Sequence, residues 1–287
     1  MKAIILAGGQ GTRLYPQTKL INKHLLSVYD KPMIYYPISI AMLSRIKNIA
    51  IVCNEKDKEN FLRLLGDGSQ LGVKFTYFIQ KQSDGIVGAI KTCEDFISND
   101  KLMVLLGDNI FYGNELIKII NKSYKSECVI FSHSTSKYKN FGVAEYRNNR
   151  IIKIHEKPNK YFSTRVIVGL YIFNKNLIEK ISKVKKSKRG ELEITEVINR
   201  YIKLNKCTEV KLNRGISWFD TGTFDDFVRA STFLQIIYKE QSLGVGLIES
   251  IAFSEGFINK KKFISLVSKI KNSEYKEKIL QNINLIK

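Results

Sequence analysis

The stretch KAIILAGGQGTR, residues Lys2 to Arg13, decides the fold class of this chain. Its five apolar residues from Ala3 to Ala7 predict a buried strand, and three glycines follow within four residues. Glycine allows a positive φ and lets successive backbone N–H groups surround an anion. A strand that ends in such a turn is typical of an α/β sheet with a phosphate site at its carboxyl edge.

The first half of the chain continues this α/β pattern, because β-branched runs alternate with amphipathic segments. The expected strands are Lys2–Ala7, Asn48–Cys53, Lys74–Ile79 and Leu102–Leu106. The expected helices are Met33–Ile46, Lys56–Leu65 and Ile86–Phe96. Right-handed crossovers would place these helices on both faces of one sheet. We therefore predict a three-layer α/β/α fold.

The second half extends the same core and makes the predicted sheet mixed. After a helix over Glu115–Ser123, the expected strands are Cys128–His133, Val143–Tyr146, Ile151–Ile154 and Val166–Phe173. Arg147-Asn148-Asn149-Arg150 is a hairpin-turn candidate. Helices are expected over Thr195–Leu204 and Phe224–Tyr238, the second capped by Thr223. We predict a core over residues 1–240 and a Lys-rich helical C-terminal extension over 241–287.

The composition restricts the class of protein. Of the 287 residues 44% are hydrophobic, which excludes a mainly disordered chain. Lys and Arg number 47 against 27 acidic residues, a net charge of +20. This excess favours a polyanionic partner, such as a phosphorylated metabolite, nucleic acid or an anionic membrane. The lysines are nevertheless spread along a chain rich in Ile and Asn, and an AT-rich genome would produce the same bias without any binding role.

Metal and disulfide chemistry based on cysteine is not expected. The four cysteines and three histidines lie too far apart in the sequence for a familiar zinc spacing, and we interpret the cysteines as small core residues. The chain is also too long to need a disulfide framework. Because no secretory signal or membrane-spanning run is visible, we expect a cytoplasmic protein.

The glycine turn does not complete either common nucleotide motif. Leu14 stands where the dinucleotide fingerprint has its third glycine, and no Gly-Lys-Ser/Thr follows as a Walker A loop requires. Two cations lie nearby, Arg13 at the end of the turn and Lys23 ten residues on. The planar guanidinium of Arg13 and the compact ammonium of Lys23 suit different phosphate oxygens. A tight turn with surface cations is the alternative interpretation.

Two aspartates form a candidate metal site. Asp108 follows the strand Leu102–Leu106, and Asp220 ends the run Trp218-Phe219-Asp220. Carboxylates delivered by separate strand ends suit Mg²⁺, which prefers oxygen ligands and shares its coordination with substrate phosphates. Each aspartate taken alone is equally compatible with a helix cap.

Other candidates follow strands or interrupt them. Glu156-Lys157-Pro158 ends a strand with a carboxylate beside a cation, which would accept hydroxyls and bind an anion, or simply form a surface ion pair. Gln80 and Gly85 follow the third strand and would face a base. Gly142 and Gly169 would allow a ring to approach closely, or would mark bulges.

Taken together, the motifs resemble those of the sugar nucleotidyltransferases, and more narrowly the glucose-1-phosphate thymidylyltransferases. They occur in family order over almost the whole chain: GGQGTRLYP, NKHLL, YDKPMIYYP, GDGSQLG, GDNIFYG, FGVAEY, EKP, GLYIF, RGELEIT and WFDTGT. The resemblance implies the nucleotide-diphospho-sugar transferase fold, which is Rossmann-like. It also implies that glucose 1-phosphate attacks the α-phosphorus of dTTP, giving dTDP-glucose and pyrophosphate, at the start of dTDP-rhamnose and related deoxysugar pathways.

The resemblance further implies roles for individual residues, a Mg²⁺ cofactor and a homo-oligomer, a tetramer in this family, with no nucleic acid or membrane partner. Catalytic roles fall to Arg13, Lys23, Asp108 and Asp220, and metal binding to Asp108 and Asp220. The nucleotide would be bound by Gly8, Gly11, Thr12, Arg13, Gln80, Gly85 and Asp108. The sugar phosphate would be bound by Asn109, Gly142, Glu156, Lys157, Ile167 and Gly169.

Three positions depart from the family pattern and keep an alternative open. Ser27 replaces a usual Pro, Gly88 a longer polar residue, and Val168 a frequent Thr. The last two touch the base and sugar pockets, so a UTP-dependent uridylyltransferase on the same scaffold is the main alternative. A nucleic-acid-binding protein and a nicotinamide dehydrogenase are the alternatives from other classes.

Overall fold

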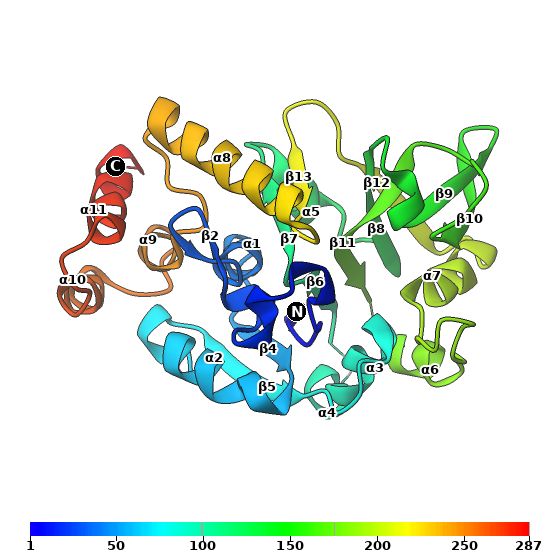
Figure 1. The fold of residues 1–287 in the computed structure, drawn as a ribbon, viewed down its shortest axis with the longest axis horizontal. Helices are drawn as coiled ribbons and strands as arrows, with labels where there is room; N and C mark the ends of the chain where they lie inside the picture. Colours follow the sequence, from blue (N-terminus) through cyan, green and yellow to red (C-terminus); the bar gives the residue numbers. More distant parts are fainter. Residues whose placement is uncertain (99, 175, 287) are drawn as a thin grey trace.

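A nine-stranded mixed sheet lies between two layers of helices in the computed structural model, which describes residues 1–98, 100–174 and 176–286 (Figure 1). The parallel half has the order β6-β1-β4-β5, formed by Leu102–Leu106, Lys2–Leu6, Asn48–Cys53 and Lys74–Ile79. All four strands were predicted. Their side chains alternate between two apolar cores, with Ala3 and Ile5 in one and Ile4 and Leu6 in the other.

Helices cover both faces of this sheet, which confirms the three-layer prediction. One core includes residues of α1 (Tyr35–Leu43), α2 (Lys58–Leu65) and α5 (Leu116–Lys122). The opposite core includes residues of α3 (Gly85–Thr92), α4 (Glu94–Ile97), α6 (Leu177–Ser182) and α7 (Ile194–Lys203). Three of the four cysteines are buried in these cores and Cys207 is half-buried, as their interpretation as core residues requires.

The antiparallel half joins the sheet through β11 (Arg165–Phe173), which pairs with β6. β11 also pairs with β8 (Cys128–Ser134) and β9 (Gly142–Arg147). β10 (Arg150–Glu156) pairs with β9, and β12 (Cys207–Lys211) pairs in parallel with β8. The predicted turn between β9 and β10 is confirmed. Asn148 and Asn149 have φ values of 50° and 59°, the left-handed pair that a tight hairpin needs and that Asn tolerates.

Several predicted helix bounds were wrong. The helix expected over Ile86–Phe96 is two helices, because Cys93 leaves the helical conformation and its N–H donates to Ile90 three residues back. Thr and Cys are weak helix formers, so the break falls where propensity is low. The helix expected over Met33–Ile46 ends at Leu43, since Arg45 has a φ of 62°. The helix expected from Lys56 begins at Lys58, after a 3-10 turn.

In the described part of the chain, two small sheets stand outside the main one, and their strand pairings were not predicted. One pairs β2 (Ser27–Val28) with β3 (Lys31–Pro32). The other pairs β7 (Asn109–Tyr112) with β13 (Ser217–Asp220) and sets Asp220 opposite Asn109. This second pair brings a late segment of the chain to the end of β6.

The C-terminal helices begin with α8 (Phe224–Gln241), which Thr223 caps as predicted, its hydroxyl accepting from the backbone N–H of Asp226 at 3.2 Å. Three more helices follow: α9 (Ile248–Ser254), α10 (Lys260–Ser268) and α11 (Glu274–Ile286). Of these, α9 packs on α1. Lys278 of α11 is only 1% exposed, and its Nζ lies 3.1 Å from the Asp30 carboxylate between β2 and β3. The boundary at residue 240 stays a prediction. In the described part of the chain, no helix is both long and apolar enough to cross a membrane.

Candidate active site

The glycine turn after β1 has the conformation that the sequence predicted for a phosphate loop. Gly11 has a φ of 63°, and a Cβ there would lie 2.8 Å from the Thr18 methyl. The Thr18 hydroxyl donates to the Gly11 carbonyl at 2.9 Å. Gly8 is buried, and a Cβ there would lie 2.9 Å from the Gln80 amide oxygen. Only glycine therefore lets this turn close while keeping its backbone near the cavity.

Lys23 is held beside this turn by a buried network around Asn22. The Asn22 amide donates to the Ala7 carbonyl at 3.1 Å and to the Asp57 carboxylate at 2.8 Å, while its oxygen accepts from the His24 backbone at 2.9 Å. Burial, and then the charge of Lys23, lower the pKa of His24 to about 3, so that its ring is neutral. The Lys23 ammonium forms an ion pair with Asp108 at the end of β6.

The structure brings Asp220 to Asp108, as the sequence predicted. The Thr221 N–H and hydroxyl both donate to the Asp108 carbonyl, at 3.0 and 2.8 Å. Burial acts against the ionised form of Asp108, but the charge of Lys23 holds the pKa of Asp108 below its usual range. Burial, and then the negative charge of Asp108, raise the pKa of Asp220. The positive charges of Lys23 and Arg13 act in the opposite direction but offset this rise only in part.

This carboxylate pair fits a magnesium ion that is shared with a substrate. Within the described residues, no group of three or more His, Cys, Asp or Glu side chains gathers to hold an ion unaided. Mg²⁺ is commonly held by one or two carboxylates, with water and phosphate oxygens completing its coordination. A cation near Asp220 would also relieve the repulsion that raises its pKa.

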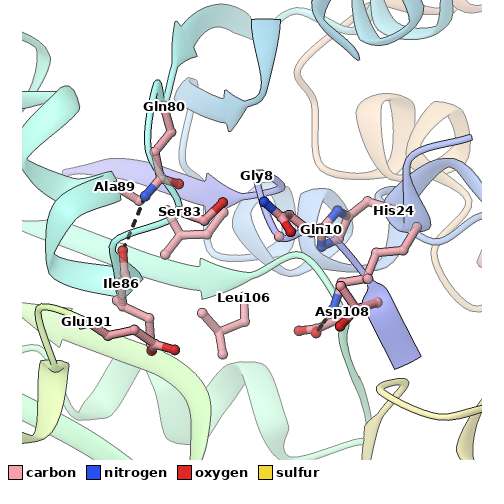
Figure 2. A pocket seen from close by; sticks show the side chains of 16 residues that line it. Gly8, Gln10, His24, Gln80, Ser83, Ile86, Ala89, Leu106, Asp108 and Glu191 are labelled. Carbon is pink, nitrogen blue, oxygen red and sulfur yellow. Dashed lines mark hydrogen bonds and ion pairs between the residues drawn. The ribbon is translucent and has the colours of Figure 1, made fainter. Parts of the chain in front are cut away.

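A cavity of about 360 Å³ joins the turn, the ion pair and the end of β5, and Figure 2 shows its lining side chains. It contains Gly8, Gly11, Thr12, Lys23, Gln80, Gly85 and Asp108, all of them predicted. Sequence reasoning missed Gln10, His24, Ser83 and Glu191, which also line it. Glu191 belongs to the RGELEIT motif, so this motif could have marked it as a candidate site residue. The motif does not indicate that Glu191 lines the cavity.

One end of this cavity is bounded by the Gln80 amide, which donates to Asp84 at 3.0 Å and to the Gly85 carbonyl at 3.4 Å. Gly85 has a φ of 91°. At Gly88, one of the departures from the family pattern, a Cβ would lie 1.8 Å from the Asp84 carboxylate. The glycine there makes room for Asp84, which in turn orients Gln80.

Arg13 lies outside this cavity but close to Asp220. Both groups lie next to Gly222. A Cβ added to Gly222 would be 2.7 Å from the Arg13 guanidinium and 3.0 Å from the Asp220 carboxylate. Arg13 lines a second cavity of about 330 Å³ together with Asp220 and Trp218. Trp218 was not predicted as a site residue, although the WFDTGT motif contains it. Arg13 and Lys23 thus approach the carboxylate pair from two sides.

The residues predicted for the sugar phosphate lie around the ends of β9, β10 and β11. The Asn109 oxygen accepts from the Gly169 backbone at 2.9 Å and the Trp218 indole at 2.6 Å, and its amide donates to Asp108 at 2.9 Å. A Cβ at Gly142 would lie 3.6 Å from the Glu156 carboxylate. Ile167 is buried and Lys157 exposed. These residues form a neighbourhood beyond Asp108, outside the lining of the first cavity.

The pKa of Glu156 is raised, first by the burial of its carboxyl group and then by the negative charge of nearby Glu193. Arg189 partly offsets this, because its guanidinium lies 3.3 Å from the Glu156 carboxylate. The Lys157 backbone N–H donates to the Phe141 carbonyl at 3.0 Å, which fixes the turn after β10.

Replacing Gly169 by alanine is expected to lower the free energy of unfolding by about 2 kcal/mol, because overpacking of this kind costs about 1–3 kcal/mol. The new Cβ would lie 2.6 Å from the Leu106 side chain and 2.7 Å from that of Asn109. Displacing Asn109 would also remove its bond to Asp108, so activity should fall. Urea unfolding and a rate assay measure the two effects.

Gly215→Ala is the control for this variant, since no atom of the neighbouring residues that the structure describes lies within 4 Å of a Cβ there. Its φ of 88° predicts a smaller loss of stability, about 1 kcal/mol, with unchanged activity. Equal activity of the two variants would contradict the role given to Asn109.

The fold and the geometry of this site are typical of proteins that bind a nucleotide by its phosphates at the carboxyl edge of an α/β sheet. The glycine turn offers backbone donors, and the aspartate pair suits a cation shared with phosphate. Residues 2–237 match the family model described as nucleotidyl transferase. The chain belongs to this family of enzymes. Membership favours the nucleotidyltransferase prediction over the dehydrogenase and nucleic-acid alternatives.

Similar proteins carry more specific names. The glucose-1-phosphate thymidylyltransferase of Neisseria meningitidis is 38% identical over 284 residues, 98% of this chain and 99% of its own. That of Mycolicibacterium smegmatis is 38% identical over 283 residues, 98% of each chain. A crystal structure from Bacillus anthracis, described as a thymidylyltransferase with bound sucrose, has a TM-score of 0.75 at 38% identity, covering 81% of this chain and 94% of that one. A UDP-glucose pyrophosphorylase with bound UDP-glucose has a TM-score of 0.72 at 25% identity, covering 83% and 98%.

Proposed function

We propose that this enzyme transfers a thymidylyl group from dTTP to glucose 1-phosphate and releases pyrophosphate. The observation that carries the proposal is the buried Lys23–Asp108 pair beside the glycine turn, with Asp220 drawn to the same point by β13. The named relatives, at 38% identity over nearly their full length, support the choice of substrates.

The proposed nucleotide site is the cavity at the glycine turn. Backbone donors at Gly8, Gly11 and Thr12 would bind the phosphates, and Gln80 with Gly85 would face the base. Arg13, which lies near Asp220, would contact the pyrophosphate group of the bound triphosphate, and Lys23 would contact the α-phosphate. The common position of most of these groups around one cavity supports this assignment.

The proposed sugar site lies beyond Asp108. Asn109 and Glu156 would accept or donate bonds to hydroxyls, and Lys157 would bind the phosphate that attacks. Gly142 and Gly169 would leave room for the ring, with Ile167 behind it. The bond from Asn109 to Asp108 supports a direct link between this site and the phosphates.

Asp108 and Asp220 are the proposed ligands of Mg²⁺. A bound Mg²⁺ would neutralise charge on the phosphates and so favour attack at the α-phosphorus. The attacking phosphate oxygen is already ionised, so the protein has to supply no nucleophile or general base. Lys23 and Arg13 would instead hold the reacting groups in line and stabilise the charge that develops on the leaving pyrophosphate.

Three further assignments are proposals of the same kind. Residues 1–240 would form the catalytic core and residues 241–287 an extension that packs on it through α9. The enzyme would act in the cytoplasm as a homotetramer, by its resemblance to the family. Gel filtration with light scattering tests the assembly.

Competition between dTTP and UTP, with glucose 1-phosphate as acceptor, tests the nucleotide. We expect kcat/KM to favour dTTP by about tenfold or more, because one methyl in an apolar pocket is worth about 1–3 kcal/mol. The apolar wall of the cavity, which includes Leu6, Ile86 and Ala89, is suited to receive this methyl. Equal or better use of UTP would establish the uridylyltransferase alternative instead. Replacing glucose 1-phosphate by other sugar phosphates tests the acceptor.

A further inference from the structure

A recess of about 840 Å³, distinct from the two cavities described above, lies on the outer side of the glycine turn. Lys19, Lys56 and Lys81 line it, and they come from three separate segments that follow β1, β4 and β5. Among the described residues that line this recess, none is acidic. Its polar walls therefore carry positive charge without internal compensation.

These three lysines also lack the ion pairs that neutralise other lysines of the site region. Lys23 pairs with Asp108 and Lys137 with Asp226. All three recess lysines are exposed, and no carboxylate of the described residues lies within ion-pair distance of their ammonium groups. Like charges that face one recess repel each other, so a multiply charged anion bound there would be stabilised by all of them.

The recess adjoins the nucleotide cavity directly. Gln10, Thr12 and Ser83 line both. Figure 2 labels Gln10 and Ser83 among the side chains that line the cavity. An anion that leaves the cavity past the glycine turn therefore enters a region of unpaired positive charge.

We infer that this recess binds inorganic pyrophosphate, the leaving group, after it separates from the nucleotide. The inference rests on the proposed function. In that reaction the sugar phosphate oxygen forms a bond to the α-phosphorus, and the bond from this phosphorus to the bridging oxygen breaks. The pyrophosphate leaves with the electron pair of that bond and with its full negative charge.

A separate exit site has a physical purpose. Arg13 and Lys23 would stabilise the negative charge of the reacting phosphates. If they bound the released pyrophosphate equally tightly, its slow dissociation would limit turnover. Three exposed lysines bind more weakly, since exposed charge pairs are each worth little. They draw the product outward and present the same path to pyrophosphate in the reverse reaction.

The test compares two triple variants that lose the same charge. Lys19→Gln/Lys56→Gln/Lys81→Gln removes the recess lysines. Lys185→Gln/Lys203→Gln/Lys269→Gln is the control, because these exposed lysines do not line the recess. Calorimetric titration with sodium pyrophosphate, and the KM for pyrophosphate in the reverse reaction with dTDP-glucose, are measured for both and for the unaltered enzyme.

We expect the recess variant to bind pyrophosphate about tenfold more weakly and its KM for pyrophosphate to rise by the same factor. The KM for dTDP-glucose and the saturated rate should stay within twofold, and the control should match the unaltered enzyme. Unchanged pyrophosphate binding, or an equal change in the control, would overturn the inference. A loss confined to kcat/KM for dTTP would overturn it too, because the recess would then serve the incoming triphosphate.

Failure of the proposed function gives a different result. In that case the unaltered enzyme would form no dTDP-glucose, whereas calorimetry would still show whether the recess lysines bind pyrophosphate.

Discussion

Replacing Asp108 by asparagine is expected to lower kcat for dTDP-glucose formation by about a thousandfold. A loss of this size follows when one preorganised electrostatic contact to the reacting groups is removed. Asparagine keeps the shape of the side chain but not its charge, so Lys23 loses its buried partner and the proposed metal site loses one of its two carboxylates. Asp220→Asn should produce a loss of similar size. Release of pyrophosphate in a coupled assay measures both.

Asp225→Asn is the matched control, since Asp225 is exposed in the first turn of α8, five residues after Asp220. It should leave kcat unchanged. Circular dichroism at the assay temperature shows whether the two site variants are folded. If folded Asp108→Asn kept more than a tenth of the activity, the assignment of the metal ligands would be wrong.

The second large effect is expected for Lys23→Gln, which should lower kcat by about a hundredfold to a thousandfold. Lys23 is only 8% exposed and is the one cation paired with Asp108 among the described residues. Its removal leaves the buried Asp108 without a charged partner, and breaking a buried ion pair in this way costs about 3–5 kcal/mol. The melting temperature should therefore fall together with the rate.

Lys23→Arg separates the two effects of this substitution. It restores the charge, so stability should largely return, but a planar guanidinium does not replace a compact ammonium at a single phosphate oxygen. Activity should stay well below that of the unaltered enzyme. Lys74→Gln, at an exposed position that begins β5, is the control and should affect neither quantity. Full activity of Lys23→Gln would refute the role proposed for Lys23.

The parallel half of the fold could be predicted almost to the residue. β4 and β5 have the predicted bounds, because each is a mainly apolar or β-branched run with polar residues at its ends. Helix ends were less predictable. The break at Cys93 depends on tertiary packing and on a local bond to Ile90, and neither has a strong signature in the sequence.

The candidate site divides in the same way. Gly8, Lys23 and Asp108 could be expected to meet, since parallel strands end at a common edge of the sheet. The sequence proposed Asp220 as the second carboxylate of a metal site, but it did not predict the pairing that brings Asp220 there, because β7 and β13 are four-residue strands in a sheet of their own. Glu191 could not be placed at all, since its position depends on backbone bonds between Leu192 and the loop before α3.

The pairing of β7 with β13 also bears on how the enzyme is made. The bond from Thr221 to Asp108 spans 113 residues, whereas the last residue that lines the nucleotide cavity is Glu191. A nascent chain leaves the ribosome from its N-terminus, and a domain generally folds as a unit. A chain that has emerged as far as α7 thus contains every residue that lines that cavity but not Asp220, so the polypeptide carries the proposed nucleotide-binding residues before it carries the second proposed metal ligand.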